Sequence, residues 1–160
     1  RACSAPSADR ADQRVTPLDF ARDERAGKPV RFAGYAAVFD HPDSGGDIIR
    51  PGAFAASLKA ARDVPLLWQH KAGAVIGRVE QLSEDKRGLR VIASLSGNEQ
   101  ARRVGRLLDG KKVDGLSFGY RVRKAGKKDG LRELIELDLV EVSLVAQPMQ
   151  PKARVHAVES

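Results

Sequence analysis

The chain has 160 residues, 42% of them hydrophobic and 5% aromatic, and 28 Lys and Arg against 21 Asp and Glu give a formal net charge of +7. This length predicts one domain that buries its own core. A single cysteine, Cys3, excludes an intramolecular disulfide and a cysteine-based zinc site. No run approaches the roughly 18 apolar residues of a membrane span and no secretory signal is recognisable, so we expect a protein of the cytoplasm or of a particle interior. The three histidines lie in separate segments, and we expect no metal or other cofactor.

The first segment, residues 1–28, is polar and charged, and we expect it to form a flexible N-terminal arm. Residues 30–40 are rich in aromatic and β-branched side chains and predict a strand, which a turn-forming cluster at 41–46 ends. Pro51 suits the first turn of a helix, and apolar residues then recur at helical spacing to about Arg62.

The middle of the chain predicts three further strands and a second helix. Residues 64–70 form a compact apolar run, and residues 74–82 and 89–95 resemble the two arms of a β-hairpin. Asn98 is a good N-cap for a helix that carries apolar residues on one face and arginines on the other.

The C-terminal part predicts two strands, 113–123 and 131–145, joined by a basic loop at 124–130. We expect the folded domain to span 29–153 and residues 154–160 to form a C-terminal tail. The many strands, the two helices and the lack of a regular βαβ rhythm favour an α+β, mainly β class. Within it, we predict a closed or strongly bent antiparallel β-barrel with flanking helices.

The segment DGLSFGY, residues 114–120, is the most informative for chemistry. Strand alternation places Gly115, Ser117 and Gly119 on one face. A hydroxyl between two positions without side chains leaves room for another backbone to approach closely, as an extended peptide substrate requires. This makes the two glycines candidate substrate-binding positions. The alternative is a strand whose glycines relieve crowding and whose serine has no chemical role.

His70 follows Trp68 at the end of an apolar run, and alternation places the two on one face, with the imidazole at the rim of an apolar region. A histidine in that setting is suited to act as a general base. The alternative is a strand-end histidine that is bonded to a backbone carbonyl.

Glu141 lies in a run of apolar residues, and alternation places it on the face of Leu137 and Leu139. A carboxylate on an apolar face must find a partner or shift its pKa. His70 is a suitable partner, because a carboxylate orients the imidazole in acyl-transfer triads. The alternative is a β-bulge near Val140 that returns Glu141 to solvent.

Four ordered blocks carry a resemblance to a known family. They are FAGYAAVFDHPDSGGDIIRPGAF, PLLWQH, GLSFGY and ELDLVEVSLVAQPMQPKA, within residues 30–153. In order and spacing they resemble the prohead (procapsid maturation) serine proteases of tailed phages, which are relatives of the herpesvirus assemblins. The resemblance implies an assemblin-like β-barrel with flanking helices, and a protease domain over 29–153. It implies an endopeptidase that cleaves the scaffolding segment of the major capsid protein, and often itself.

The resemblance also implies roles for single residues. The nucleophilic serine of the family falls on Ser117, and the histidine of the WQH block, which acts as general base and acid, falls on His70. In the assemblins the third member is a second histidine. This sequence offers Glu141 in the corresponding block, with Asp138 as a fallback.

The partner that the resemblance implies is the precursor of the major capsid protein or its scaffolding segment. The place of action is the assembling procapsid in the cytoplasm of the bacterial host, with self-association into a homodimer as in the assemblins. No cofactor, membrane or specific nucleic acid is implied. A phage, a prophage or a gene transfer agent is an equally suitable source of the gene.

Two other functions remain open from the sequence. A non-catalytic capsid-assembly or scaffold factor on the same fold would keep the apolar strands and lack a competent triad. A nucleic-acid-binding module would use the excess positive charge, and its binding would fall steeply with salt. The cations available to it are Arg102, Arg103, Arg106, Lys111, Lys112, Lys124, Lys127 and Lys128.

Overall fold

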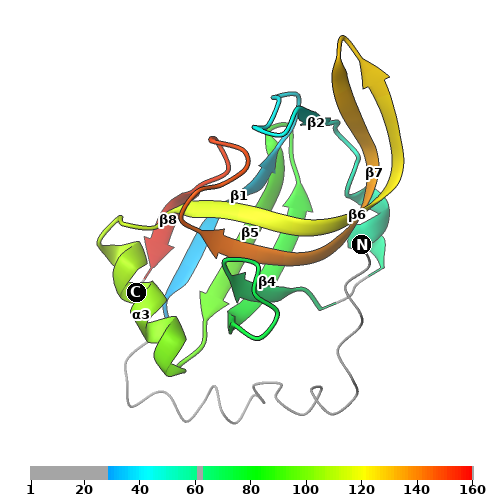
Figure 1. The fold of residues 1–160 in the computed structure, drawn as a ribbon. Coiled ribbons are helices and arrows are strands. Elements are labelled where there is room, and N and C mark those ends of the chain that lie inside the picture. The colour runs from blue at the N-terminus through cyan, green and yellow to red at the C-terminus, as the bar shows by residue number, and fades with distance from the viewer. Residues whose placement is uncertain (1–28, 61–62, 160) are drawn as a thin grey trace.

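The computed structural model describes residues 29–60 and 63–159, and the strands in these ranges form one curled, eight-stranded sheet (Figure 1). Its order is β2-β7-β3-β4-β5-β1-β8, and β6 pairs with β7. The strands are β1 (Arg31–Val38), β2 (Asp47–Ile49), β3 (Pro65–Trp68), β4 (Val75–Glu84), β5 (Gly88–Leu95), β6 (Gly115–Lys128), β7 (Leu131–Val145) and β8 (Val155–Glu159). The helices are α2 (Ala55–Lys59) and α3 (Glu99–Asp109).

The long strand β7 organises the part of the sheet that matters for function. β6 pairs antiparallel with β7 along its length, while β2 pairs with its first part and β3 with its last part, both in parallel. The predicted bent, mainly β architecture with flanking helices is therefore confirmed. The sheet is mixed and not purely antiparallel, because β2 and β3 run in the same direction as β7. The chain between β2 and β3 contains α2 and irregular turns.

The hydrophobic core fills the inside of the curl. Phe118 of β6 and Leu139 and Val142 of β7 belong to one buried cluster with Phe54, whose ring meets that of Phe118 edge-on at 5.2 Å. α2 packs beside this cluster, and the hydroxyl of Ser57 accepts a hydrogen bond of 2.9 Å from the backbone N–H of Leu139. One face of β6 and β7 is thus committed to the core, which leaves the other face for chemistry.

The two ends of the sheet meet where the chain approaches β8. Gly115 and Arg154 form an isolated antiparallel bridge, with hydrogen bonds from Leu116 N–H to Ala153 O (2.9 Å) and from Val155 N–H to Asp114 O (2.8 Å). β8 then pairs with β1, so the predicted tail at 154–160 is wrong over Val155–Glu159. The strand is short, and it forms by pairing antiparallel with the edge of β1 that β5 leaves open.

Two local predictions also need correction, and one strand was not predicted. The predicted loop at 124–130 is mostly strand, because β6 continues to Lys128 and the turn is confined to Asp129 and Gly130, with φ of 52° and 78°. The helix predicted from Pro51 to Arg62 is reduced to α2, with turns before it, and β2 was not predicted. The predicted arm at 1–28 lies outside the described residues.

The predicted helix after Asn98 is confirmed as α3, and the Asn98 side chain accepts a hydrogen bond of 2.8 Å from Ala101 N–H. No helix in the described ranges is long and apolar enough to cross a membrane.

Candidate active site

The sequence candidates Ser117, His70 and Glu141 come from three elements that lie side by side in the sheet. β7 lies between β6 and the end of β3. Ser117 of β6 is directly opposite Ser143 of β7, and Glu141 lies two residues earlier on β7. His70 lies two residues after the end of β3 at Trp68. Strand pairing thus brings together residues that are separated by up to 71 positions in the chain.

A β-bulge determines the face on which Glu141 lies. Gly119 pairs with Glu141 but Tyr120 pairs with Leu139, so Val140 is an extra residue on β7. Because cross-strand partners share a face, Leu139 joins Tyr120 on the core side and Glu141 joins Gly119 on the opposite side. The bulge that we considered is therefore present, and Glu141 does not share the face of Leu139. It is not returned to solvent either, since Glu141 is only 7% exposed.

His70 occupies a strained turn at the end of β3. Gln69 and His70 both have positive φ, 54° and 61°, so strand alternation ends at Trp68 and the predicted common face of Trp68 and His70 does not apply. Left-handed backbone at non-glycine residues is uncommon and gathers at functional sites. Here it is held by hydrogen bonds from Gln69 N–H to Leu144 O (3.0 Å) and from Ala146 N–H to the Gln69 side chain (3.2 Å).

The His70 ring and the Glu141 carboxylate are in direct contact. Nδ1 of His70 forms a short hydrogen bond with Oε1 of Glu141. The imidazole is 41% exposed, whereas the carboxylate is almost fully covered. Since Nδ1 is engaged by Glu141, Nε2 is the ring nitrogen that remains for proton transfer. This is the division of work between the two nitrogens in a histidine general base.

Ser143 joins the same cluster, although its Val and Leu neighbours in the sequence favour a core-facing position over a hydrogen bond near Glu141. Its hydroxyl donates a hydrogen bond of 2.6 Å to Oε2 of Glu141 and accepts one of 3.2 Å from the backbone N–H of His70. Ser143 is fully buried. The signal that could have identified it is simple: residues 141 and 143 are two apart on one strand and therefore share a face.

Ser117 is 7% exposed and lies across the strand pair from Ser143, whose hydroxyl contacts the His70 backbone. Within the described part of the chain, Ser117 forms no hydrogen bond with His70. Hydrogen bonds between a nucleophile and its base are often long in an unliganded enzyme and tighten when substrate binds. The fallback residue Asp138 bonds to Arg123 and not to His70.

The two glycines beside Ser117 have a different environment from the one we expected. A Cβ at Gly119 would lie 2.7 Å from Oε1 and 2.8 Å from Cγ of Glu141, and a Cβ at Gly115 would lie 2.8 Å from Pro148. At Gly115 the nearest atom is the backbone oxygen of Val145, at 2.6 Å, so this glycine makes room for the neighbouring strand, whereas Gly119 makes room for the Glu141 side chain. The expectation that a substrate backbone approaches Gly115 and Gly119 stays a prediction.

Other kinds of site gain no support from the described residues. No cluster of three or more His, Cys, Asp or Glu side chains suited to a metal ion occurs in residues 29–60 and 63–159. The cations proposed for nucleic-acid binding divide between α3 with its following turn and the β6–β7 hairpin, which lie at opposite ends of the molecule (Figure 1). They therefore come from two separate parts of the fold.

Comparison with known proteins gives a family match. A sequence model described as Caudovirus prohead serine protease matches residues 16–160. The chain is 38% identical over 112 residues to the "Prohead protease" of Enterobacteria phage HK97, an alignment that covers 68% of this chain and 48% of that protein. The chain thus spans about half the length of this curated relative.

Solved structures share the fold at low sequence identity. The KSHV protease in complex with a hexapeptide phosphonate inhibitor has a TM-score of 0.63 at 13% identity, over 83% of this chain and 66% of that one. The bacteriophage T4 capsid assembly protease has a TM-score of 0.60 at 10% identity, over 74% of this chain and 82% of that one. The varicella-zoster virus protease has a TM-score of 0.54 at 16% identity, over 82% and 64% of the two chains.

Proposed function

Because the chain belongs to the Caudovirus prohead serine protease family, we propose that it is a serine endopeptidase of prohead maturation. Its substrate is the scaffolding segment of the major capsid protein precursor, and it acts inside the assembling procapsid in the bacterial cytoplasm. The observation that carries this proposal is the contact between His70 and Glu141 on the strand face that also holds Ser117. A histidine with one nitrogen held by a buried carboxylate, near a buried serine, is the arrangement that nucleophilic acyl transfer requires.

The proposed reaction follows from these positions. Oγ of Ser117 attacks the carbonyl carbon of the scissile amide while Nε2 of His70 takes the hydroxyl proton. The imidazolium then gives this proton to the leaving amine as the C–N bond breaks, which leaves an acyl ester on Ser117. Water hydrolyses the ester, with His70 again taking and returning a proton. Glu141 holds the ring through Nδ1 and stabilises the imidazolium.

The test uses the protein with the capsid precursor from the same genome. The wild type should release a scaffolding fragment, and Ser117→Ala should abolish release. Ser83→Ala on β4 is a matched control, because it removes a hydroxyl outside the cluster, and it should cleave like the wild type. Mass spectrometry of protein treated with a serine-reactive phosphonate should locate the adduct on Ser117. Cleavage by Ser117→Ala at the wild-type rate would show that the nucleophile is elsewhere.

The same experiment decides between catalysis and a purely structural role. If the wild type neither cleaves the precursor nor reacts with the phosphonate, a non-catalytic assembly factor on this fold becomes the better explanation. Fragments of the protease itself in the same spectra would demonstrate self-processing.

A further inference from the structure

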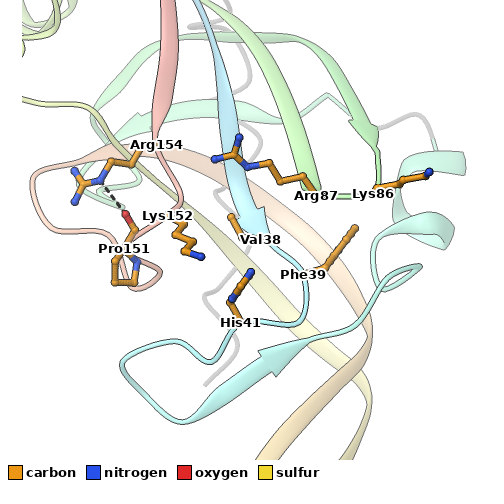
Figure 2. Close-up of a pocket in the computed structure, with 8 residues that line it drawn as sticks. All are labelled: Val38, Phe39, His41, Lys86, Arg87, Pro151, Lys152 and Arg154. Atoms are coloured by element: carbon orange, nitrogen blue, oxygen red, sulfur yellow. Dashed lines mark hydrogen bonds between the residues drawn. The ribbon is translucent and has the colours of Figure 1, made fainter.

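A second feature with chemical character lies outside the His70 cluster. A cavity of about 520 Å³ opens between the end of β1, the β4–β5 turn and the segment that leads into β8 (Figure 2). Every charged or titratable side chain that lines it is basic. These side chains are His41, Lys86, Arg87, Lys152 and Arg154.

Some of these cations already have partners. Arg154 forms an ion pair of 2.6 Å with Asp114, and its Nε donates to Pro151 O at 2.9 Å. The guanidinium of Arg87 lies over the Tyr35 ring at 4.8 Å. Lys86 and Lys152 are exposed and form no ion pair in the described ranges. The cavity therefore keeps uncompensated positive charge, which favours an anionic ligand.

The wall of this cavity is connected to the strand of Ser117. Arg154 is bridged to Gly115, which precedes Ser117 by two residues, or roughly 7 Å along a strand. Gln150 is buried, and its amide makes two hydrogen bonds to the backbone of Val38, of 2.8 and 2.9 Å. Pro148 packs on Gly115. The residues from 148 to 154 thus form a fixed connection between the candidate active site and the cavity.

We propose that this cavity binds the carboxylates of an acidic segment of the polypeptide substrate, a few residues from the bond that is cleaved. The proposal rests on the proposed function, since it names a chemical feature of the substrate of that site. An extended peptide advances about 3.3 Å per residue, so a segment held at Ser117 reaches the cavity within a few residues. A peptide is favoured over nucleic acid because the substrate of the proposed function is a polypeptide, and because the Phe39 ring in the cavity lining is buried and is not available for base stacking.

Binding is tested first without catalysis. Fluorescein-labelled hexaglutamate is titrated into the Ser117→Ala protein and followed by anisotropy. Replacing the two unpaired cations, in Lys86→Ala/Lys152→Ala, should raise its Kd about tenfold. The matched control is Lys127→Ala/Lys128→Ala, which removes the same charge from the far hairpin of β6 and β7, and it should change the Kd less than about twofold. Equal weakening by both pairs would show attraction by net charge alone and would overturn the proposal.

Substrate use is tested next, in the Ser117-containing protein with the capsid precursor. The Lys86→Ala/Lys152→Ala variant should raise KM about tenfold and leave kcat unchanged, because the cavity binds substrate away from the reacting bond. An unchanged KM would overturn docking of the substrate. An oligothymidylate of equal charge that binds the cavity more tightly than hexaglutamate would overturn the choice of a peptide. Failure of the wild type to cleave the precursor would count against the proposed function, whereas the hexaglutamate titration would still decide whether the cavity binds carboxylates.

Discussion

The hydroxyl of Ser143 donates a hydrogen bond of 2.6 Å to Oε2 of Glu141, in a part of the sheet where neither residue reaches solvent freely. The Ser143 hydroxyl oxygen also accepts a hydrogen bond of 3.2 Å from the backbone N–H of His70. Ser143 therefore holds both partners of the His70–Glu141 contact: it binds the carboxylate of Glu141 and the main-chain N–H of His70. We interpret Ser143 as a positioning residue, since it acts on the imidazole through these two contacts.

Ser143→Ala should lower kcat about 10- to 100-fold with little change in KM, because substrate binding does not use this hydroxyl. It should also lower the free energy of unfolding by about 1–3 kcal/mol, since a buried carboxylate oxygen loses its donor. Steady-state kinetics with the capsid precursor and urea unfolding measure the two effects. Ser143→Thr keeps the hydroxyl and should recover much of kcat. Equal kcat values for the Ala and Thr variants would mean that the hydroxyl has no positioning role.

Glu141→Gln should reduce kcat by about 10²- to 10⁴-fold, because a neutral amide does not stabilise the imidazolium that forms when Ser117 gives up its proton. Asp138→Asn is the matched control on the same strand. Asp138 bonds to Arg123 at the surface, so its loss should change kcat less than about twofold. Rate measurements that gave the larger loss for Asp138→Asn would exchange the roles of the two carboxylates.

The strands were predictable from the sequence where the pattern was local. Residues 131–145 alternate and end at turn-forming residues, and the structure has a strand with the same bounds. β8 was not predictable, because Val155–Glu159 forms a strand only through long-range pairing with β1. At the Asp129-Gly130 turn the local signal was present in the sequence, but the boundary of the strand was still missed. Its residue types fit a hairpin turn, but the basic residues before it obscured the end of β6.

The candidate site was predictable in its residue types and not in its geometry. Ser117, His70 and Glu141 were identified from motif and pattern. The extra residue Val140 reverses the face of Glu141, and a period-two pattern contains no information about such an insertion. The left-handed backbone at Gln69 and His70 was equally hidden, since neither residue is a glycine and glutamine rarely adopts positive φ.

A pH-dependent contribution to stability is expected from Tyr35 and Asp85, whose side chains are hydrogen-bonded. The bond lowers the pKa of the Asp85 carboxyl and raises the pKa of the Tyr35 hydroxyl. Because the carboxyl pKa is lowered in the folded state, Asp85 stabilises the fold at pH values above its ordinary pKa, near about 4. This contribution disappears as the pH falls through the folded-state pKa. A raised Tyr pKa contributes below about 10 and is lost as the pH rises through the folded-state value.

Tyr35→Phe should therefore reduce the free energy of unfolding at neutral pH, by less than about 1 kcal/mol because both groups are open to solvent. The difference from the wild type should shrink below about pH 4 and above about pH 10. Urea unfolding at several pH values measures it. A difference that is constant across this range would assign the effect to packing of the ring and not to the hydrogen bond.

Gly119→Ala tests whether the absence of a side chain on β6 positions Glu141. A methyl group there would lie 2.7 Å from the carboxylate oxygen that contacts His70, so the carboxylate must move, and kcat should fall at least about tenfold. Gly126→Ala on the same strand is the matched control, because its Cβ would meet only Ile135 at an ordinary 3.7 Å. The decisive measurement is a double-mutant cycle. In a Glu141→Ala background the methyl group has room, so Gly119→Ala should then change kcat less than about twofold. If Gly119→Ala costs the same factor in both backgrounds, the glycine serves the strand pairing and not the carboxylate.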